Sequence, residues 1–422
     1  METHQPLSIE ELTDVLSLTI KADEENKIAT FLCQLSAFTH DAQFNISFNA
    51  PSSSGKSYIP LEISGLFPQE DVIKIGNCSP TAFFHEQGEY NKETNSIVVD
   101  LARKIIIFLD MPHTQLLERL RSFLSHDERE MHSKITDKNQ KGGNRTKTVI
   151  LRGFPSVIFC SAGLRIDEQE STRFLLLSPE ATPEKIMLGI NQAIRKSSNS
   201  TEYEEWLNSD PRRKLLKSRI LAIKQAHIGD IQICSEDLVK RRFLADKKLL
   251  KPRHQRDIKR FMALIKSIAL LNYWWREQTQ TGIIANEEDI EEAFKIWDKI
   301  SISQEFNLPP YVYKIYKDLI VPLWKVKEQA IKEDQFVFDK RPGISRQDIL
   351  QKHFDVHGRM LDIYQLRQQI IPMLETAGLV TQEQDSNDKR RWLILPAVIT
   401  EEEEYGVDHG GVTDKQEESQ TI

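Results

Sequence analysis

The sequence predicts an α/β fold, in which helices cover both faces of a parallel sheet. Two observations predict it. Short apolar runs of strand length, such as residues 105–109, alternate along the chain with segments of helical spacing, which is typical of parallel sheets. In addition, residues 50–57 form a turn of small residues between a strand pattern and a helix pattern.

The first 42 residues are expected to form an N-terminal helical segment. Ser8 is a candidate helix cap, and Glu11 completes a capping box with it. The segment lacks the basic region and apolar core of a secretory signal, and no apolar run approaches the ~18 residues that a membrane span needs. The four cysteines are far apart and form no C-x-x-C pair, which favours buried thiols in a reducing compartment. We therefore expect a cytoplasmic protein that does not cross a membrane.

The core domain is expected over residues 43–200, and its first strand leads into the sequence NAPSSSGKS. This matches the phosphate-loop pattern G-x-x-x-x-G-K-[ST], except that Ala50 replaces the first glycine. The amides of such a loop and the positive end of the next helix attract phosphate. Lys56 would contact the β- and γ-phosphates, and the Ser57 hydroxyl would bind Mg²⁺. The residues expected to contact ATP here are Ala50, Pro51, Ser52, Ser53, Ser54, Gly55, Lys56, Ser57 and Tyr58. The alternative is a surface loop with an incidental lysine.

Asp110 follows the apolar run of residues 105–109 and is the expected second half of a nucleotide site. An acidic residue at the end of a buried strand beside a phosphate loop can hold Mg²⁺, usually through water. Many ring ATPases place a glutamate after this aspartate, whereas this chain has Met111. Glu118, on the next helix, is the candidate that would orient the attacking water instead, and the alternative is that it faces solvent.

A basic hairpin is expected within the core domain at residues 131–150, because a Gly-Gly turn separates two strand patterns. The formal net charge of −7 resides in the tail of residues 399–422, which has eight acidic residues against one basic residue. We expect this tail to be disordered. Since the remaining chain is neutral, the clustered cations predict contact with the phosphates of single-stranded DNA, and the alternative is a solvated turn. These cations are Lys138, Lys141, Arg145 and Lys147.

Two further domains are expected after the core. Residues 201–330 are basic and have helical spacing, which predicts an all-α lid, with Asn286 as the cap of one helix. Residues 331–398 follow the order helix, helix, and two strands around a basic turn, which is typical of a winged helix-turn-helix. Winged helices bind duplex DNA or dock proteins, and both remain candidates.

The order of these elements carries a resemblance. Strand, phosphate loop, strand ending in aspartate, helix, basic hairpin, strand and basic helical lid resemble the AAA+ ATPases that carry a hairpin before the sensor-1 strand. The minichromosome-maintenance helicases belong to that clade. The stretches ADEENKIATFL…NAPSSSGKSY and RHQRDIKRFMALIKSIALLNYWWRE are also similar to the helicase ATPases found with primase modules on mobile elements. The resemblance covers about residues 15 to 300.

The resemblance implies roles for single residues. Ser161 in FCSAG stands at the polar sensor-1 position, although the usual asparagine is missing. Arg173 in STRF corresponds to an arginine that reaches the nucleotide of a neighbouring subunit, and its alternative is a salt bridge at a strand end. Either Arg253 or Arg256 would be sensor 2, with a solvated basic helix face as the alternative. The hairpin would project into the channel of a ring.

Together these features predict a P-loop AAA+ ATPase that uses ATP and Mg²⁺ and assembles as a ring, a hexamer in our expectation. It would move along DNA as a helicase of a mobile element or phage-like replicon. A separate primase chain is a candidate partner, because no zinc-ligand cysteine cluster is present in the sequence. The alternative is a nucleotide-gated DNA-binding initiator, loader or regulator with little unwinding activity, which Met111 favours.

Overall fold

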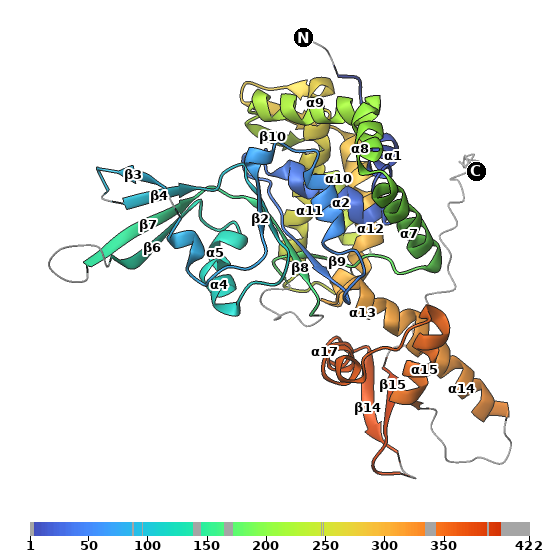
Figure 1. Ribbon diagram of the computed structural model, residues 1–422. Helices are drawn as coiled ribbons and strands as arrows, with labels where there is room; N and C mark the ends of the chain where they lie inside the picture. The colour runs from blue at the N-terminus through green and yellow to red at the C-terminus, as the bar shows by residue number, and fades with distance from the viewer. Residues whose placement is uncertain are drawn as a thin grey trace, which may run out of the picture.

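The structure is a computed structural model of the chain (Figure 1). It describes residues 4–86, 88–94, 96–137, 145–163, 172–245, 247, 249–333, 343–385 and 388–397. The expected acidic tail of residues 399–422 lies outside these ranges, as do Lys138 and Lys141 of the expected hairpin. Within the described part of the chain, no helix is both long enough and apolar enough to span a membrane.

A five-stranded parallel sheet forms the centre of the molecule. Its strand order is β2-β5-β8-β1-β9. The strands are β1 (Ile46–Asn49), β2 (Val72–Ile75), β5 (Ile105–Phe108), β8 (Ser156–Ser161) and β9 (Leu175–Leu177). The four strands other than the edge strand β2 are buried along their length, as parallel strands covered on both faces must be. The predicted α/β fold with a parallel sheet is therefore confirmed.

Helices cover both faces of this sheet, and alternate side chains of each strand enter two different cores. Ile105 and Ile107 of β5 pack with the helices of one face, which are α1 (Ile9–Leu16), α2 (Glu24–Ser36), α3 (Tyr58–Ser64), α11 (His254–Leu271) and α12 (Glu287–Glu305). Ile106 and Phe108 pack on the opposite face with α4 (Thr114–Arg119) and α5 (Arg121–Leu124). Successive strand residues point to opposite faces. Both faces are apolar, so the sheet is the interior of the core.

A second sheet projects away from the core, as Figure 1 shows. Its order is β3-β4-β7-β6, formed by β3 (Glu89–Asn91), β4 (Ser96–Asp100), β6 (Glu130–Asp137) and β7 (Arg145–Arg152). β6 and β7 pair antiparallel from Glu130 opposite Arg152 to Asp137 opposite Arg145. These are the two strands of the hairpin expected at residues 131–150. The parallel pairing of β4 with β7 was not anticipated from the sequence.

The two sheets meet at a sharp junction. β4 leads into β5, and β7 leads into β8 through residues 153–155. Gly153 has a φ of +82°, and a Cβ atom there would lie 2.6 Å from the backbone of Ala102. Glycine is the residue that combines a positive φ with so close an approach of two backbones. The projecting sheet is therefore fixed to the amino ends of β5 and β8.

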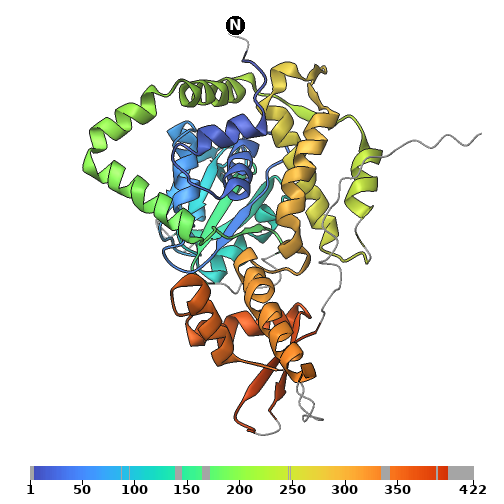
Figure 2. The same cartoon turned by 90° about the vertical axis from the view of Figure 1, so that its right-hand side faces the viewer.

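The region after β9 is mainly helical. It contains α7 (Pro183–Ser198), α8 (Ser200–Ser209), α9 (Pro211–Ala226), α10 (Glu236–Ala245), α11 and α12. Figure 2 shows α7 and α8 as an arm beside the core, and no side chain of α7 is fully buried. The expectation of an all-α lid at residues 201–330 is wrong in one respect. The region includes a three-stranded sheet of order β10-β12-β11, formed by β10 (Asp230–Ile233), β11 (Glu277–Gln278) and β12 (Gly282–Ala285).

The C-terminal unit has a hydrophobic core of its own, in which Val312, Leu319, Ile349, Leu366 and Ile394 are fully buried. Its helical elements are α13 (Pro310–Lys314), η4 (Ile315–Ile320), α14 (Val321–Glu333), α15 (Arg346–His357), α16 (Ile363–Gln365), η5 (Leu366–Ile370) and α17 (Ile371–Thr376). An antiparallel sheet of order β13-β15-β14 completes it, formed by β13 (Ile344–Ser345), β14 (Val380–Gln384) and β15 (Trp392–Pro396). The unit lies below the core in Figures 1 and 2.

Candidate functional site

The expected phosphate loop connects β1 to α3 at the carboxyl end of the sheet. Ser53 and Gly55 have φ values of +64° and +90°, so the chain turns sharply there. The amides of Tyr58 and Ile59 both donate to the Gly55 carbonyl, at 3.0 and 3.3 Å. Ala50 is not among the described residues with a positive φ. An alanine therefore fits where the pattern usually has glycine.

The helix after the loop is short. α3 spans seven residues, and Lys56 and Ser57 precede it in the turn. Because aligned peptide dipoles add along a helix, such a short helix contributes a weak positive end. Pro60 lies in its first turn, where a missing amide costs no helical hydrogen bond. Phosphate binding at this loop would depend more on Lys56 and the loop amides than on the helix dipole that we expected to contribute.

The end of β8 lies between the loop and Asp110. β8 pairs with β1 on one side and with β5 on the other. The Sγ atom of Cys160 on β8 lies 3.5 Å from the Lys56 carbonyl oxygen. Burial raises the pKa of the Cys160 thiol to about 12, a rise that Ser57 and Lys56 oppose and Asp110 reinforces. All three groups are thus near enough to Cys160 to influence its ionisation.

Ser161 and Asn49 close the polar end of these two strands. The Oγ atom of Ser161, the last residue of β8, accepts from the Gly163 amide at 3.1 Å. Asn49, the last residue of β1, donates through its side-chain amide to the Gly163 carbonyl at 3.1 Å. Both side chains are buried. Asn49 is a polar residue at the site that the phosphate-loop pattern does not include, because it precedes the pattern by one position.

The groups at this end of the sheet include oxygen donors of the kind that bind Mg²⁺ beside phosphates. The Ser57 hydroxyl and the Asp110 carboxylate are hard oxygen donors of the kind that Mg²⁺ prefers, alongside substrate phosphates. The described residues contain no group of three or more histidine, cysteine, aspartate or glutamate side chains that could hold a metal without a substrate. The Oγ atom of Ser54 is buried and has no hydrogen-bond partner in the described part of the chain. A phosphate oxygen at the loop would satisfy it.

Asp110 and Glu118 differ in their surroundings. Asp110 is exposed at the carboxyl edge of the sheet, and its Oδ1 atom accepts from the Met111 amide at 2.8 Å. Glu118 on α4 has a side chain that is 52% exposed and lies 4.0 Å from Arg121. The interactions described for Glu118 do not include the phosphate loop. Its surroundings agree with the alternative in which it faces solvent.

A cavity beside the loop is large enough for the nucleoside part of a ligand. It has a volume of about 550 Å³, within the usual range of ligand pockets. Its loop side consists of Ser53, Ser54 and Gly55. The Tyr58 hydroxyl donates to the Thr19 carbonyl at 2.8 Å, and burial raises the pKa of Tyr58. Apolar residues on its other walls include Ile20, Ile59, Ile186, Ile190 and Ala193.

Most residues of this cavity were missed in the sequence. Ile186 and Ile190 lie four positions apart on α7, so they share one helix face. Both remain about half exposed, at 52% and 51%. The i, i+4 spacing was a usable signal, but it could equally have predicted packing against the core. Lys21, Lys185 and Lys196 add positive charge at the rim, and Lys185 is ion-paired with the buried Asp23.

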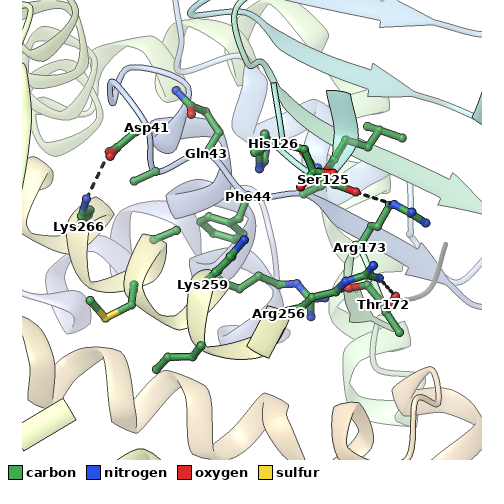
Figure 3. Close-up of a pocket in the computed structure, with 18 residues that line it drawn as sticks. Asp41, Gln43, Phe44, Ser125, His126, Thr172, Arg173, Arg256, Lys259 and Lys266 are labelled. Atoms are coloured by element: carbon green, nitrogen blue, oxygen red, sulfur yellow. Dashed lines mark hydrogen bonds and ion pairs between the residues drawn. The ribbon is translucent and has the colours of Figure 1, made fainter. Parts of the chain in front are cut away.

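Arg173 lies at the opposite end of the sheet from the phosphate loop. It precedes β9, and β9 runs parallel to β1 with Leu175 opposite Ile46. Arg173 lines a second cavity of about 440 Å³ and donates from Nε to the Ser125 hydroxyl at 2.7 Å. Figure 3 shows Arg256 from α11 reaching Thr172 beside it. The cavity is also lined by Lys259, Lys266 and His126.

The two sensor-2 candidates have different surroundings. Arg253 is 8% exposed, and its guanidinium contacts the Asp257 carboxylate at 2.8 and 3.3 Å. Arg256 instead lies in the cavity with Arg173. Arg260, which was not predicted from the sequence, also lines this cavity. Its guanidinium contacts the Asp257 carboxylate at 2.7 Å, and burial lowers the pKa of Arg260 to about 10. Arg253 is thus held by Asp257, whereas Arg256 lines the cavity at the opposite end of the sheet from the phosphate loop.

The hairpin cations are described only in part. Lys147 is half-buried on β7, opposite Ile135 of β6. Arg145 begins β7 opposite Asp137, and its side chain lies outside the described part of the structure, as do Lys138 and Lys141. The described residues therefore give the strands that carry the cations, but not the surface that the cations form.

No protein-family model matches the chain, and no curated protein matches it. The resemblance to hairpin-bearing AAA+ helicases consequently rests on the order of the motifs and on the two sequence stretches quoted above.

Proposed function

We propose that the chain is an AAA+ ATPase that binds ATP with Mg²⁺ at the loop of residues 50–57 and acts on DNA as a ring. The observation that carries the proposal is the convergence of Lys56, Ser57 and Asp110 around Cys160 at one edge of a parallel sheet. The Ser54 hydroxyl, which is buried without a hydrogen-bond partner among the described residues, supports a phosphate ligand at the same place.

Each residue of the site has a distinct task in this proposal. The Lys56 ammonium donates to oxygens of the β- and γ-phosphates, while the loop amides and Ser54 donate to the remaining oxygens. Mg²⁺, when bound, neutralises charge that develops on these phosphates. Ser57 and Asp110 would hold the cation, as hard oxygen donors. Ser161 faces the γ-phosphate from the strand between them.

The strand order supports the AAA+ assignment over a simpler phosphate-binding fold. β8 lies between β1, which leads into the phosphate loop, and β5, which leads into Asp110. Ser161 at the end of β8 therefore lies between the phosphate loop and Asp110, as expected of the sensor-1 residue in an AAA+ ATPase. Arg173 and Arg256 share a cavity at the amino end of β9, the opposite end of the sheet from the phosphate loop. A guanidinium there serves the nucleotide of a neighbouring subunit in a ring, for which we propose a hexamer.

DNA is the proposed substrate of the motor. The projecting sheet carries the basic hairpin away from the nucleotide site, which suits contact with a single strand in the channel of a ring. The helices and three-stranded antiparallel sheet of the C-terminal unit support a winged helix, with duplex DNA as its proposed ligand. We propose a cytoplasmic helicase of a mobile element or phage-like replicon, with a separate primase chain as a candidate partner.

The test is ATP hydrolysis by the full chain with and without single-stranded DNA. We expect hydrolysis that DNA stimulates, and we expect Lys56→Ala to abolish hydrolysis and to weaken ATP binding. Lys74→Ala is the matched control, because Lys74 is an exposed cation on β2 outside the site. If Lys56→Ala retains full turnover while Lys74→Ala behaves as the wild type, the proposal is wrong.

A second function is favoured by one observation. Met111 stands at the position of the usual glutamate, and the Glu118 carboxylate is exposed beside Arg121. A site without a group that orients water would bind ATP and turn it over slowly. The chain would then be a nucleotide-gated initiator, loader or regulator. Tight ATP binding that depends on Lys56, together with turnover that DNA does not stimulate, would favour this function.

A further inference from the structure

The C-terminal unit contributes two residues to the cavity beside the phosphate loop. His357 ends α15, and Arg359 lies in the turn that follows it. Both line the same cavity of about 550 Å³ as Ser53, Ser54 and Gly55. Residues that are some 300 positions apart in the sequence therefore form one pocket wall. The C-terminal unit is thus part of the candidate nucleotide pocket.

A series of hydrogen bonds, most of them buried, joins this turn to the strand that enters the phosphate loop. The Ser178 hydroxyl donates to the carbonyl of Asn49, the last residue of β1, at 2.7 Å. The same hydroxyl accepts from the Tyr311 amide at 3.0 Å. The Tyr311 hydroxyl is hydrogen-bonded to His353 Nε2 at 3.4 Å, and His353 Nδ1 to the Arg359 carbonyl at 2.9 Å. The position of the turn is thereby tied to the start of the loop.

Arg359 has a charge that the described residues do not neutralise. Its side chain is exposed, and no carboxylate in the described part of the chain lies within ion-pair distance of it. Its side chain is hydrogen-bonded to Tyr311, whose pKa burial raises and Arg359 lowers. Burial and the charge of Arg359 lower the pKa of His357. His357 is therefore a neutral hydrogen-bonding group near pH 7.

The cavity borders one part of the loop and not the other. Its wall includes residues 53–55, whereas Lys56 and Ser57 do not line it. These two residues instead lie with Asp110 around Cys160. If Lys56 contacts the β- and γ-phosphates, the cavity side of the loop faces the α- and β-phosphates and the nucleoside. The Arg359 guanidinium at the rim of the cavity is then placed to donate hydrogen bonds to the α- and β-phosphate oxygens, which ATP and ADP have in common.

We propose that Arg359, supported by His357, is a nucleotide-contacting residue through which the C-terminal unit detects an occupied pocket. The proposal rests on the function proposed above. Arg359 donates hydrogen bonds to α- or β-phosphate oxygens of the bound nucleotide. Because linkage is reciprocal, nucleotide binding and the docked position of the C-terminal unit stabilise one another to the same extent.

The test measures ATP and ADP dissociation constants of the full chain by calorimetry without DNA. We expect Arg359→Ala to weaken binding of both nucleotides by about tenfold, as loss of one charged hydrogen bond would. Arg359→Lys should recover part of the loss. Lys325→Ala is the matched control, because Lys325 is an exposed cation of the same unit that does not line the cavity.

A second measurement separates contact from a structural role. Hydrogen exchange in residues 343–376 of the wild type should slow when ATP or ADP is added, and Arg359→Ala should lose this protection. The melting temperature of Arg359→Ala without nucleotide should equal that of the wild type. A lower melting temperature combined with partial recovery of affinity in Arg359→Lys still supports contact, whereas lower stability without any recovery in Arg359→Lys contradicts it.

The Lys56→Ala variant separates this inference from the proposed function. If Lys56→Ala loses nucleotide binding while Arg359→Ala and Lys325→Ala bind ATP and ADP as the wild type does, the inference is overturned and the function stands. If Arg359→Ala weakens ATP but not ADP, contact with the shared phosphates is also contradicted. If Lys56→Ala binds nucleotide normally, the proposed function itself fails.

Discussion

A neighbouring subunit must supply Arg173 if this residue acts on ATP at all. The register of β9 on β1 places Leu175 opposite Ile46, so Arg173 is level with Phe44. The phosphate loop begins at Ala50, six positions further along the same strand direction. At about 3.3 Å for each strand residue, the two sites are roughly 20 Å apart along the sheet. An arginine side chain cannot span that distance within its own subunit.

The perturbation is Arg173→Ala, which should leave ATP affinity unchanged and reduce hydrolysis by about 10³-fold or more, as loss of an arginine finger does. The informative sample is a ring that contains both Arg173→Ala and Lys56→Ala subunits. An ATP site in such a ring is complete where an Arg173→Ala subunit, which has an intact phosphate loop, lies beside a Lys56→Ala subunit, which has an intact Arg173. With random mixing at equal amounts, about one quarter of sites are complete, because each condition is met in half of the subunits.

The assay is steady-state ATP hydrolysis by co-assembled subunits across a series of mixing ratios. Either variant alone should be inactive, and activity should peak near equal amounts at about one quarter of the wild type. Arg241→Ala is the matched control, because Arg241 is an exposed arginine on α10 outside the cavity. Mixed rings that stay inactive at every ratio, although both variants assemble, would refute the reasoning for a shared site.

Three further predictions follow from other parts of the chain. Neutralising Lys138, Lys141, Arg145 and Lys147 together should leave basal ATP hydrolysis near normal and abolish its stimulation by DNA. In DNA titrations, loss of two phosphate contacts should flatten the slope of log K for DNA binding against log salt concentration by about 1.4. An unchanged slope would mean that the hairpin is only a solvated turn. Gly153→Ala should lower the free energy of unfolding in urea by at least about 1–2 kcal/mol, because it adds a left-handed alanine and a contact of 2.6 Å with Ala102. Stability equal to the wild type would contradict the junction geometry. Burial lowers the pKa of His126 to about 4, so the folded state binds fewer protons than the unfolded state between about pH 6.5 and 4. Stability should therefore fall as the pH falls through that window, and His126→Asn, which tolerates the positive φ of this position, should show a shallower loss in urea melts at several pH values.

Local features of the fold were predictable from the sequence. The capping box of Ser8 and Glu11 is present as expected, with hydrogen bonds of 2.9 and 3.1 Å. Asn286 caps α12 with Asp289 in the same way. Such motifs depend on residues three positions apart, so a single sequence contains the whole signal. The parallel sheet was predictable for a similar reason, since a strand buried on both faces is apolar throughout.

Features that depend on distant pairing were not predictable. Residues 97–99 and 105–108 are both uninterrupted apolar runs, yet the first pairs with β7 in the projecting sheet and the second with β2 and β8. β10 and β12 have four residues each, too few for their pattern to stand out among helices. The place of Arg359 in a cavity beside the loop depends on how the C-terminal unit docks, which no local pattern records.

The short connection between β7 and β8 has a mechanical consequence. β8 is hydrogen-bonded to β1 on one side and to β5 on the other, so it cannot slide without breaking both ladders. Residues 153–155 then join it to β7, with Gly153 packed against Ala102. The hairpin and the polar end of β8 therefore lie at opposite ends of one continuous path, β7, residues 153–155 and β8, that is hydrogen-bonded into the core sheet. If the chain is the DNA motor proposed above, a bound DNA strand would be moved by rotation of whole subunits against one another, and not by bending of the hairpin on its base.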